Sequence, residues 1–400
     1  MGVFEGLEIV EFSLGGIGPI TGKFFADYGA TVILVESISH PNFVRLTPPY
    51  KDRQAGVNRS ATWANLNSSK YSVSLNFRHP KGRQIAKQLA ARAGVVIDNF
   101  TPGVLETLGL HYEELVKVRP DLIMVSLSNF GQTGPYAKAR GVGSTMQSYV
   151  GFAGLLGWPD REPCNPYGVI PDVITPRFAA AALLAALECR ERTGKGQHLD
   201  ISQVETSLIF LSPAFIDFQA NGEIIERMGN RSLHSAPHGV YPCEGEDRWC
   251  AIEVCSDEEW QRLCEVMDRR ELSNDPRFNT TEQRKRHEEL LGEIMAAWTS
   301  SQSAEQVMSR LQEAGIAGGV VGTPPDILRD PQLSHRQHFQ VLDHPEIGMS
   351  PYEGHAFMLE EAPQIRRAPL LGEHNEYVFK QLLGMSDDEY ATLLPQGVFD

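Results

Sequence analysis

The residue best placed to do chemistry is Asp172, in the stretch PCNPYGVIPDVITPRFAAAALLAALE at 163–188. A loop broken by Pro and Gly precedes it, and an Ala- and Leu-rich run of helical composition follows. We expect Asp172 to lie in the loop that leads into a buried helix, close to the helix N-terminus, where unpaired backbone N–H groups stabilise negative charge. Such a carboxylate is a candidate nucleophile or base. The alternative is an Asp that only caps the helix.

A glycine-rich turn, SLGGIGPITG at 13–22, separates a short apolar run from a helical one. It fits the dinucleotide-binding fingerprint poorly, because the last glycine spacing is one residue too long and Pro19 intrudes. Backbone N–H groups at such a helix start can still hold another phosphate or a carboxylate. The chain has no Walker A, GxSxG or HExxH motif, and its histidines follow no zinc pattern. We expect no metal site.

Basic side chains fall on or near the loops that follow predicted strands: Arg45, Lys70, Arg78, Lys138 and Arg140. Taken one at a time, each is a surface charge exposed to solvent. Taken together, they could form a positive mouth for phosphate groups, which Lys and Arg bind well. Both interpretations stay open from the sequence.

Strands and helices alternate through the first part of the chain. Apolar strands are predicted at 7–12, 31–37, 69–77, 95–100 and 121–131, with helices at 23–30, 79–94 and 103–120 between them. This order predicts a doubly wound, Rossmann-like α/β domain with a parallel sheet. Ligands of such sheets bind beyond the carboxyl ends of the strands. The loops at 14–19, 36–45, 99–103 and 129–143 are therefore the candidate ligand loops.

The length of 400 residues exceeds one typical core, so we expect two domains. Composition changes near residue 219 and again near residue 331. The chain therefore divides into a large α/β domain at 1–218, a linker and small α+β domain at 219–330, and a C-terminal segment at 331–400.

The net charge of −15 disfavours nucleic acid and anionic membranes as partners. The six cysteines form no CxxC pair and indicate a reducing compartment. The first residues, MGVFEGLEIVEF, lack the pattern of a signal peptide, and no window is apolar for long enough to span a bilayer. We expect a cytoplasmic protein.

Seven segments stand in a fixed order along the chain: GLEIVEFSLGGIGPITGKFFADYGATVILVES, NLNSSKYSVSLNF, DNFTPGVLETLGL, SNFGQTGPY, ALLAALECRERTGKGQHLDISQVET, GNRSLHSAPHGVYPC and GEHNEYV. Each is weak alone. Together they resemble, nearly end to end, the class III coenzyme A (CoA) transferases, the family of formyl-CoA:oxalate CoA-transferase and of the carnitine and bile-acid CoA-transferases.

The resemblance implies a specific chemistry. An Asp in the position of Asp172 attacks the thioester carbonyl of an acyl-CoA, and the CoA thiolate then converts the resulting anhydride into an enzyme-CoA thioester. An acceptor acid takes over the CoA through a second anhydride. An ionised carboxylate attacks a thioester without a base of its own. No bound cofactor is implied, since CoA and acyl-CoA are substrates. Met228–Arg231 is the nearest match to a glycine-rich loop that family members bring near the active site.

The resemblance also places CoA along the strand ends of the first domain. The matching residues are Gly15, Gly16, Ile17, Ser37, Arg45, Ser72, Val73, Leu75, Asn99, Phe100 and Arg140. Two departures from the family pattern are Gly16, where Gln is common, and Gly143, where an acidic residue is common. These small residues suggest room for a bulky or dicarboxylic substrate. We expect succinyl-CoA as donor and an aromatic or branched dicarboxylate as acceptor.

Two other activities compete with CoA transfer. The related α-methylacyl-CoA racemases use a His in a Gly-His-Asp stretch, and the matching stretch here, Gly141-Val142-Gly143, has no titratable group. A racemase without its base is chemically implausible, so transfer is favoured over racemisation or an intramolecular CoA-transferring isomerisation. The third possibility is a CoA-binding protein that has lost its chemistry.

The resemblance implies an assembly as well. Family members form dimers whose two chains thread through each other like linked rings, with the small domain inserted into the large one and the C-terminal segment returning to it. We expect an interlocked homodimer, or a heterodimer with a paralogue.

Overall fold

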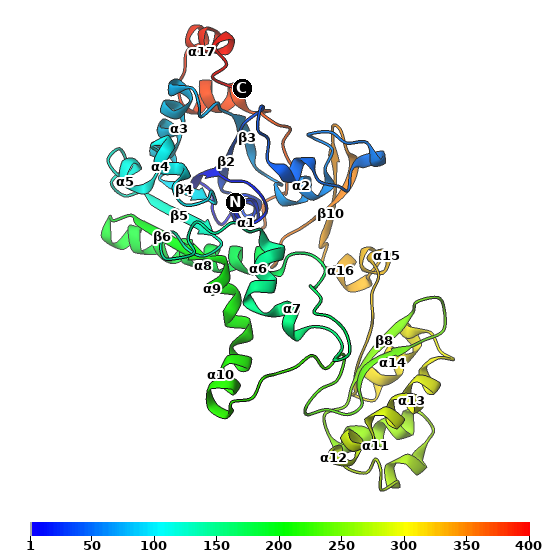
Figure 1. The fold of residues 1–400 in the computed structure, drawn as a ribbon. Helices are drawn as coiled ribbons and strands as arrows, with labels where there is room; N and C mark the ends of the chain where they lie inside the picture. Colours follow the sequence, from blue (N-terminus) through cyan, green and yellow to red (C-terminus); the bar gives the residue numbers. More distant parts are fainter. Residues whose placement is uncertain (1) are drawn as a thin grey trace. The chain divides into compact units, whose positions relative to one another are not determined.

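The computed structural model describes residues 2–400, which divide into two compact units. One unit holds the described residues up to Ala153 together with Asn165–Ile224 and Gln332–Asp400. The other holds Gly154–Cys164 and Ile225–Pro331. Both units are drawn in Figure 1.

The first unit contains a six-stranded sheet in the order β3-β2-β1-β4-β5-β6, with every neighbouring pair parallel. This arrangement confirms the predicted doubly wound α/β fold. Runs rich in Val, Ile and Leu form the inner strands, and they are buried on both faces, as parallel sheets require. The strands are β1 (Glu8–Phe12), β2 (Thr31–Glu36), β3 (Tyr71–Ser74), β4 (Val95–Asp98), β5 (Ile123–Ser128) and β6 (Gln197–Ser202).

Helices cover both faces of this sheet. On one face, α1 (Ile17–Asp27) and α8 (Ile170–Thr193) contribute Phe25 and Leu183 to the core. On the other face, α3 (Pro80–Ala93) contributes Leu89 to a core that also contains Phe379 and Phe399. The remaining helices up to residue 224 are α2 (Ala61–Leu66), α4 (Val104–Leu108), α5 (Tyr112–Leu115), α6 (Gly143–Val150), α7 (Phe152–Leu155), α9 (Gln203–Leu208) and α10 (Ser212–Asn221).

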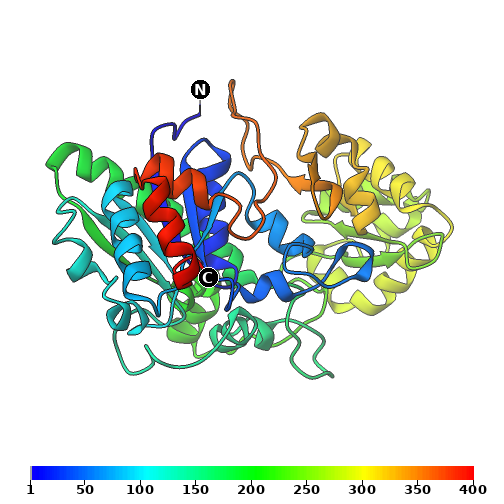
Figure 2. The same cartoon turned by 90° about the horizontal axis from the view of Figure 1, so that it is seen from above.

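The C-terminal segment returns to the first unit and covers the edge strand β3. It comprises the antiparallel pair β10 (Phe339–His344) and β11 (Gly348–Glu353), a π-helix at Tyr377–Leu382 and α17 (Asp387–Leu393). The His374 N–H donates to the Ser72 carbonyl, and the Ser74 hydroxyl donates to the Phe399 carbonyl. Figure 2 shows this red segment beside the blue and cyan N-terminal elements.

The second unit has a three-stranded antiparallel sheet, β7-β8-β9, packed on helices. β7 (His238–Pro242) and β8 (Trp249–Glu253) are antiparallel neighbours, and β9 is Ala317–Val320. Gly154–Cys164 joins this unit because the Arg227 guanidinium donates to the carbonyls of Gly154 and Arg161. The helices are α11 (Asp257–Val266), α12 (Thr281–Arg286), α13 (Glu288–Thr299), α14 (Ala304–Glu313) and α15 (Pro324–Leu328), and α16 (Pro331–His335) follows them.

Helix α8 has the length and apolar composition of a membrane span, and it is the one described helix that does. This finding differs from the expectation that no window of the sequence is apolar enough. Ala179, Leu183 and Ala186 of α8 are buried against the sheet, so its apolar composition serves the core of the first unit.

Candidate active site

Asp172 lies inside α8, in its first turn, and not in the preceding loop as the sequence predicted. The helix begins at Ile170 because Pro171 occupies a first-turn position, where a missing N–H costs nothing. Pro176 also lies within the helix and has no N–H to donate to the Asp172 carbonyl four residues earlier. The buried Gln147 fixes the helix start, because its side chain bonds the Ile170 N–H and the Gly168 carbonyl.

The Asp172 carboxylate is largely removed from water. Burial raises its pKa from 3.8 to about 6, and a hydrogen bond from Gln203 acts in the opposite direction. Gln203 Nε2 donates a hydrogen bond to Asp172 Oδ1, and Gln203 is only 1% exposed to solvent. Desolvation therefore outweighs the stabilising environment expected at a helix N-terminus. The carboxylate is still ionised near neutral pH and is a stronger base and nucleophile than an exposed Asp.

Two glycines allow the chain to approach this carboxylate closely. A Cβ built on Gly143 would lie 2.1 Å from Asp172 Oδ1, and a Cβ built on Gly16 would lie 3.0 Å from Oδ2. The place that a Cβ would take at these two positions is filled by the carboxylate itself, with the Val169 side chain beside Gly143. Room for a bulky substrate at these small residues stays a prediction.

A cavity of about 460 Å³ opens in front of Asp172 at the carboxyl ends of the strands. Among the described residues that line it, Asp172 is the only ionisable one. The lining residues are Leu14, Gly15, Gly16, Ile17, Phe43, Asn99, Phe100, Thr101, Pro102, Val104, Leu127, Ser128, Asn129, Ala137, Ala139, Gly141, Val142, Gly143, Asp172 and Gln203. The structure thus brings together six of the predicted site residues: Gly15, Gly16, Ile17, Asn99, Phe100 and Asp172.

Two asparagines hold the glycine-rich turn at the rim of this cavity. Asn99 accepts a hydrogen bond from the Leu14 N–H at 2.7 Å and donates to the Leu14 carbonyl. Asn42 accepts from the Gly15 N–H at 3.1 Å, and Gly15 adopts a positive φ of 76°. The Asn99 amide is therefore engaged with the turn, which fixes the backbone N–H groups at the start of α1.

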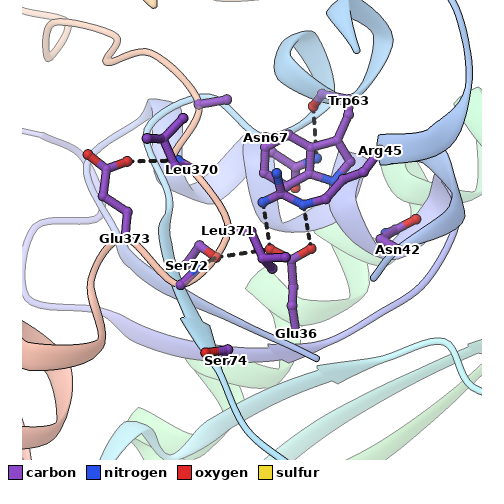
Figure 3. A network of polar contacts seen from close by, with 12 residues as sticks. Glu36, Asn42, Arg45, Trp63, Asn67, Ser72, Ser74, Leu370, Leu371 and Glu373 are labelled. Carbon is purple, nitrogen blue, oxygen red and sulfur yellow. Dashed lines mark hydrogen bonds and ion pairs between the residues drawn. The ribbon is translucent and has the colours of Figure 1, made fainter. Parts of the chain in front are cut away.

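Arg45 does not reach the cavity, and the structure corrects the expectation that it is free to bind phosphate. Arg45 is fully buried, with two hydrogen bonds of 2.8 and 2.7 Å to the Glu36 carboxylate. Its guanidinium stacks on Trp63, 3.3 Å from the ring centroid, and also bonds Asn58. Figure 3 shows this network, in which Ser72 bonds the same Glu36 carboxylate. The role of Arg45 is therefore structural.

The other predicted contacts divide into buried and exposed groups. Lys70 is buried in an ion pair with Glu11 at 2.7 Å and is likewise unavailable to a phosphate. Arg140 is exposed and lies next to the cavity-lining Gly141, whereas Ser37 is half-buried after β2. Three more of the residues matched to CoA contacts are fully buried in or directly after β3 and do not line the cavity: Ser72, Val73 and Leu75.

Sequence reasoning missed two polar residues of the cavity. Gln203 directly follows β6, whose end was not among the candidate ligand loops. Ser128 is the last residue of β5 and is 6% exposed, and its hydroxyl has no hydrogen-bond partner. The rule that polar residues at strand carboxyl ends face the ligand identifies both. Among residues 2–400, no three His, Cys, Asp or Glu side chains are grouped so as to hold a metal ion.

The fold and the cavity define an α/β protein with a cavity at the carboxyl ends of its parallel strands and one carboxylate in the lining of that cavity. The family model "CoA-transferase family III" matches residues 4–375, so the chain belongs to this family. Two relatives among those from Chloroflexus aurantiacus show the similarity. One is succinyl-CoA–D-citramalate CoA-transferase, 34% identical over 97% of this chain and 96% of its own. The other is the succinyl-CoA–L-malate CoA-transferase beta subunit, 29% identical over 97% and 96%.

A solved structure supports the same assignment. The CAIB/BAIF family protein from Brucella suis superposes with a TM-score of 0.86 at 30% identity, and the match covers 95% of this chain and 99% of that one. The chain is an acyl-CoA:carboxylate CoA-transferase, and its substrates are CoA thioesters and carboxylic acids.

Proposed function

We propose that this chain transfers CoA from succinyl-CoA to a dicarboxylic acid, with Asp172 as the covalent nucleophile. The observation that carries the proposal is the Asp172 carboxylate, the only ionisable side chain lining the described cavity. One carboxylate suffices for transfer, because it forms an anhydride and then a thioester in turn. Racemisation needs a base and an acid at the α-carbon, which this set of side chains does not supply.

Each step exchanges one acyl bond for another. An Asp172 oxygen attacks the thioester carbon of succinyl-CoA, the C–S bond breaks, and CoA thiolate leaves with the electron pair. The thiolate attacks Asp172 Cγ and expels succinate, which gives an aspartyl-CoA thioester. The acceptor carboxylate attacks the same carbon, and the released thiolate finally attacks the acceptor's acyl carbon. The high-energy acyl bond is kept throughout, and the Asp172 carboxylate is regenerated.

The substrates follow from the relatives and from the shape of the site. The two relatives described above carry succinyl-CoA in their names with a hydroxydicarboxylic acid, and we propose an acceptor of that kind. CoA then lies against Gly15, Gly16, Ile17, Asn99 and Phe100, all of which line the cavity. The exposed Arg140 is the proposed phosphate contact, in place of the buried Arg45.

We further propose an interlocked dimer located in the cytoplasm. The dimer is supported by an apolar stretch on α10 and the turn before it. Phe210 is 58% and Ile216 62% exposed, and no residue of α10 is buried. A partner chain would cover this surface. The relatives include a protein named as a beta subunit, so a paralogous partner is the alternative to a homodimer. Sedimentation of the purified chain tests the dimer, and a monomer at micromolar concentration would contradict it.

Isotope transfer tests the nucleophile. With an acceptor acid labelled with ¹⁸O in its carboxylate, each turnover leaves one acceptor oxygen on Asp172, which peptide mass spectrometry detects. Asp172→Ala should abolish transfer and still bind CoA, whereas Asp160→Asn, at an exposed position, should retain both. Turnover without label in Asp172 would refute the covalent mechanism. Deuterium exchange at the substrate α-carbon would point to a racemase.

A further inference from the structure

We propose that Gln203 is a second catalytic residue, which makes the two Asp172 oxygens unequal. In this assignment Oδ2 is the oxygen that attacks, and Gln203 holds Oδ1 as the carbonyl oxygen whenever Asp172 is acylated. The inference rests on the proposed covalent role of Asp172 and extends it to a residue that the family match does not assign.

Gln203 is held rigidly enough for this role. It is the first residue of α9, and the Ser202 side chain caps that helix by accepting from the Glu205 N–H. The hydroxyls of Thr206 and Ser207 both donate to the Gln203 carbonyl, the latter at 2.7 Å. With the residue almost fully buried and its Nε2 on Asp172 Oδ1, the amide cannot turn away without leaving a polar group unpaired.

The surroundings of the two carboxylate oxygens differ. Oδ1 is enclosed by the Gln203 amide and by the start of α6, where even a Cβ on Gly143 would lie 2.1 Å away. Oδ2 faces Gly16, whose turn forms the rim of the cavity. The printed hydrogen bond to this carboxylate engages Oδ1, and we therefore assign the attack on the acyl group to Oδ2.

This asymmetry assigns each oxygen a fate in the reaction. Oδ2 forms the anhydride bond with the donor acyl group. When the CoA thiolate then attacks Cγ, the C=O electron pair moves onto Oδ1, and the bond from Cγ to Oδ2 breaks as the donor carboxylate leaves. The pair returns from Oδ1 to form the thioester carbonyl. Gln203 Nε2 is bonded to the atom that carries this transient negative charge, and so it acts as an oxyanion donor.

The same hydrogen bond affects the first step differently. There the negative charge that develops lies on the acyl oxygen of the substrate, which Gln203 does not contact in this arrangement. Removing the donor should therefore slow attack on Cγ by about 10²- to 10³-fold, the usual effect of losing one oxyanion donor. Attack by Asp172 on the thioester should change little. The prediction is thus a change in the balance of intermediates and not only a loss of rate.

Gln203→Met tests this assignment, since Met has similar length and no donor. Enzyme mixed with succinyl-CoA alone is quenched at short times, and intact-protein mass spectrometry measures the succinyl and CoA adducts on Asp172. The wild type should accumulate the CoA thioester, and the variant the succinyl anhydride. Gln203→Leu, which also lacks a donor and introduces no charge beside Asp172, should give the same pattern if the Met variant folds poorly.

Gln147→Met is the matched control, because Gln147 is another buried glutamine near Asp172 that bonds only main-chain groups. Misplacement of the helix start in this control should slow both steps together. Thioester formation at the wild-type rate in Gln203→Met, or equal slowing of both steps, would overturn the role of Gln203. Absence of any Asp172 adduct in the wild type would instead refute the covalent function itself.

Discussion

Neutralising Asp172 should stabilise the free protein while abolishing its activity. The folded-state pKa of about 6 lies above the ordinary value of 3.8, so the folded protein binds this proton more tightly than the unfolded chain does. The stabilising contribution is complete at low pH and is lost as pH rises through 6. The two pKa values differ by about 2, and each pKa unit corresponds to about 1.4 kcal/mol. Ionised Asp172 therefore lowers the free energy of unfolding by about 3 kcal/mol relative to the protonated form.

Asp172→Asn removes this titration and keeps the shape of the side chain. We expect its free energy of unfolding to exceed that of the wild type by up to about 3 kcal/mol at pH 8 and by only about 1 kcal/mol at pH 4.5. Hydrogen exchange of the central strands β1 and β4 reports the stability of the first unit. Asp160→Asn, at an exposed position, should change stability by less than about 0.5 kcal/mol at both pH values. An Asp172→Asn variant no more stable at pH 8 than the wild type would refute the reasoning.

Two further predictions concern the walls of the cavity. Gly143→Ala should reduce transfer by about 10²-fold or more and destabilise the protein by about 1–3 kcal/mol, because its Cβ would displace the nucleophile; both are measurable by turnover and chemical unfolding. The control Gly292→Ala, in α13 with open space around it, should keep full activity, and equal effects of the two changes would contradict the account. Ser128→Ala should weaken CoA binding about 2- to 10-fold in calorimetry without destabilising the free protein, because the Ser128 hydroxyl has no partner to lose. An unchanged affinity would mean that the hydroxyl does not bind the ligand.

Local pattern predicted the parallel sheet well, and it singled out Asp172, the carboxylate that lines the cavity. Runs such as TVILVE carry their own strand signal, and the regular alternation with helices fixes a parallel sheet. Asp172 stood out because a single acidic residue precedes a long apolar helix. Its position inside that helix was missed, because Pro171 and Pro176 suggest a loop when their places within the helix are unknown.

Tertiary contacts decided the rest. The sequence alone suggests that Arg45 is a surface cation. The structure shows that it is paired with Glu36, the last residue of β2. Gln203 meets Asp172 across 31 residues, through the packing of α9 on α8, and no local signal encodes that approach. The sequence shows that residues 16 and 143 have no side chain. It does not show that the backbone at both positions lies so close to the Asp172 carboxylate that a Cβ would lie 3.0 Å or less from it.

The pairing of β3 with the far end of the chain has a consequence for biosynthesis. The Asn76 N–H donates to the Val398 carbonyl, and the Ser74 hydroxyl to Phe399, more than 300 residues after that strand leaves the ribosome. A nascent chain therefore carries this sheet with an open edge until residues 398 and 399 have been synthesised. The edge of the sheet therefore closes late in synthesis, and an affinity tag fused after Asp400 would be attached directly to the segment that closes it.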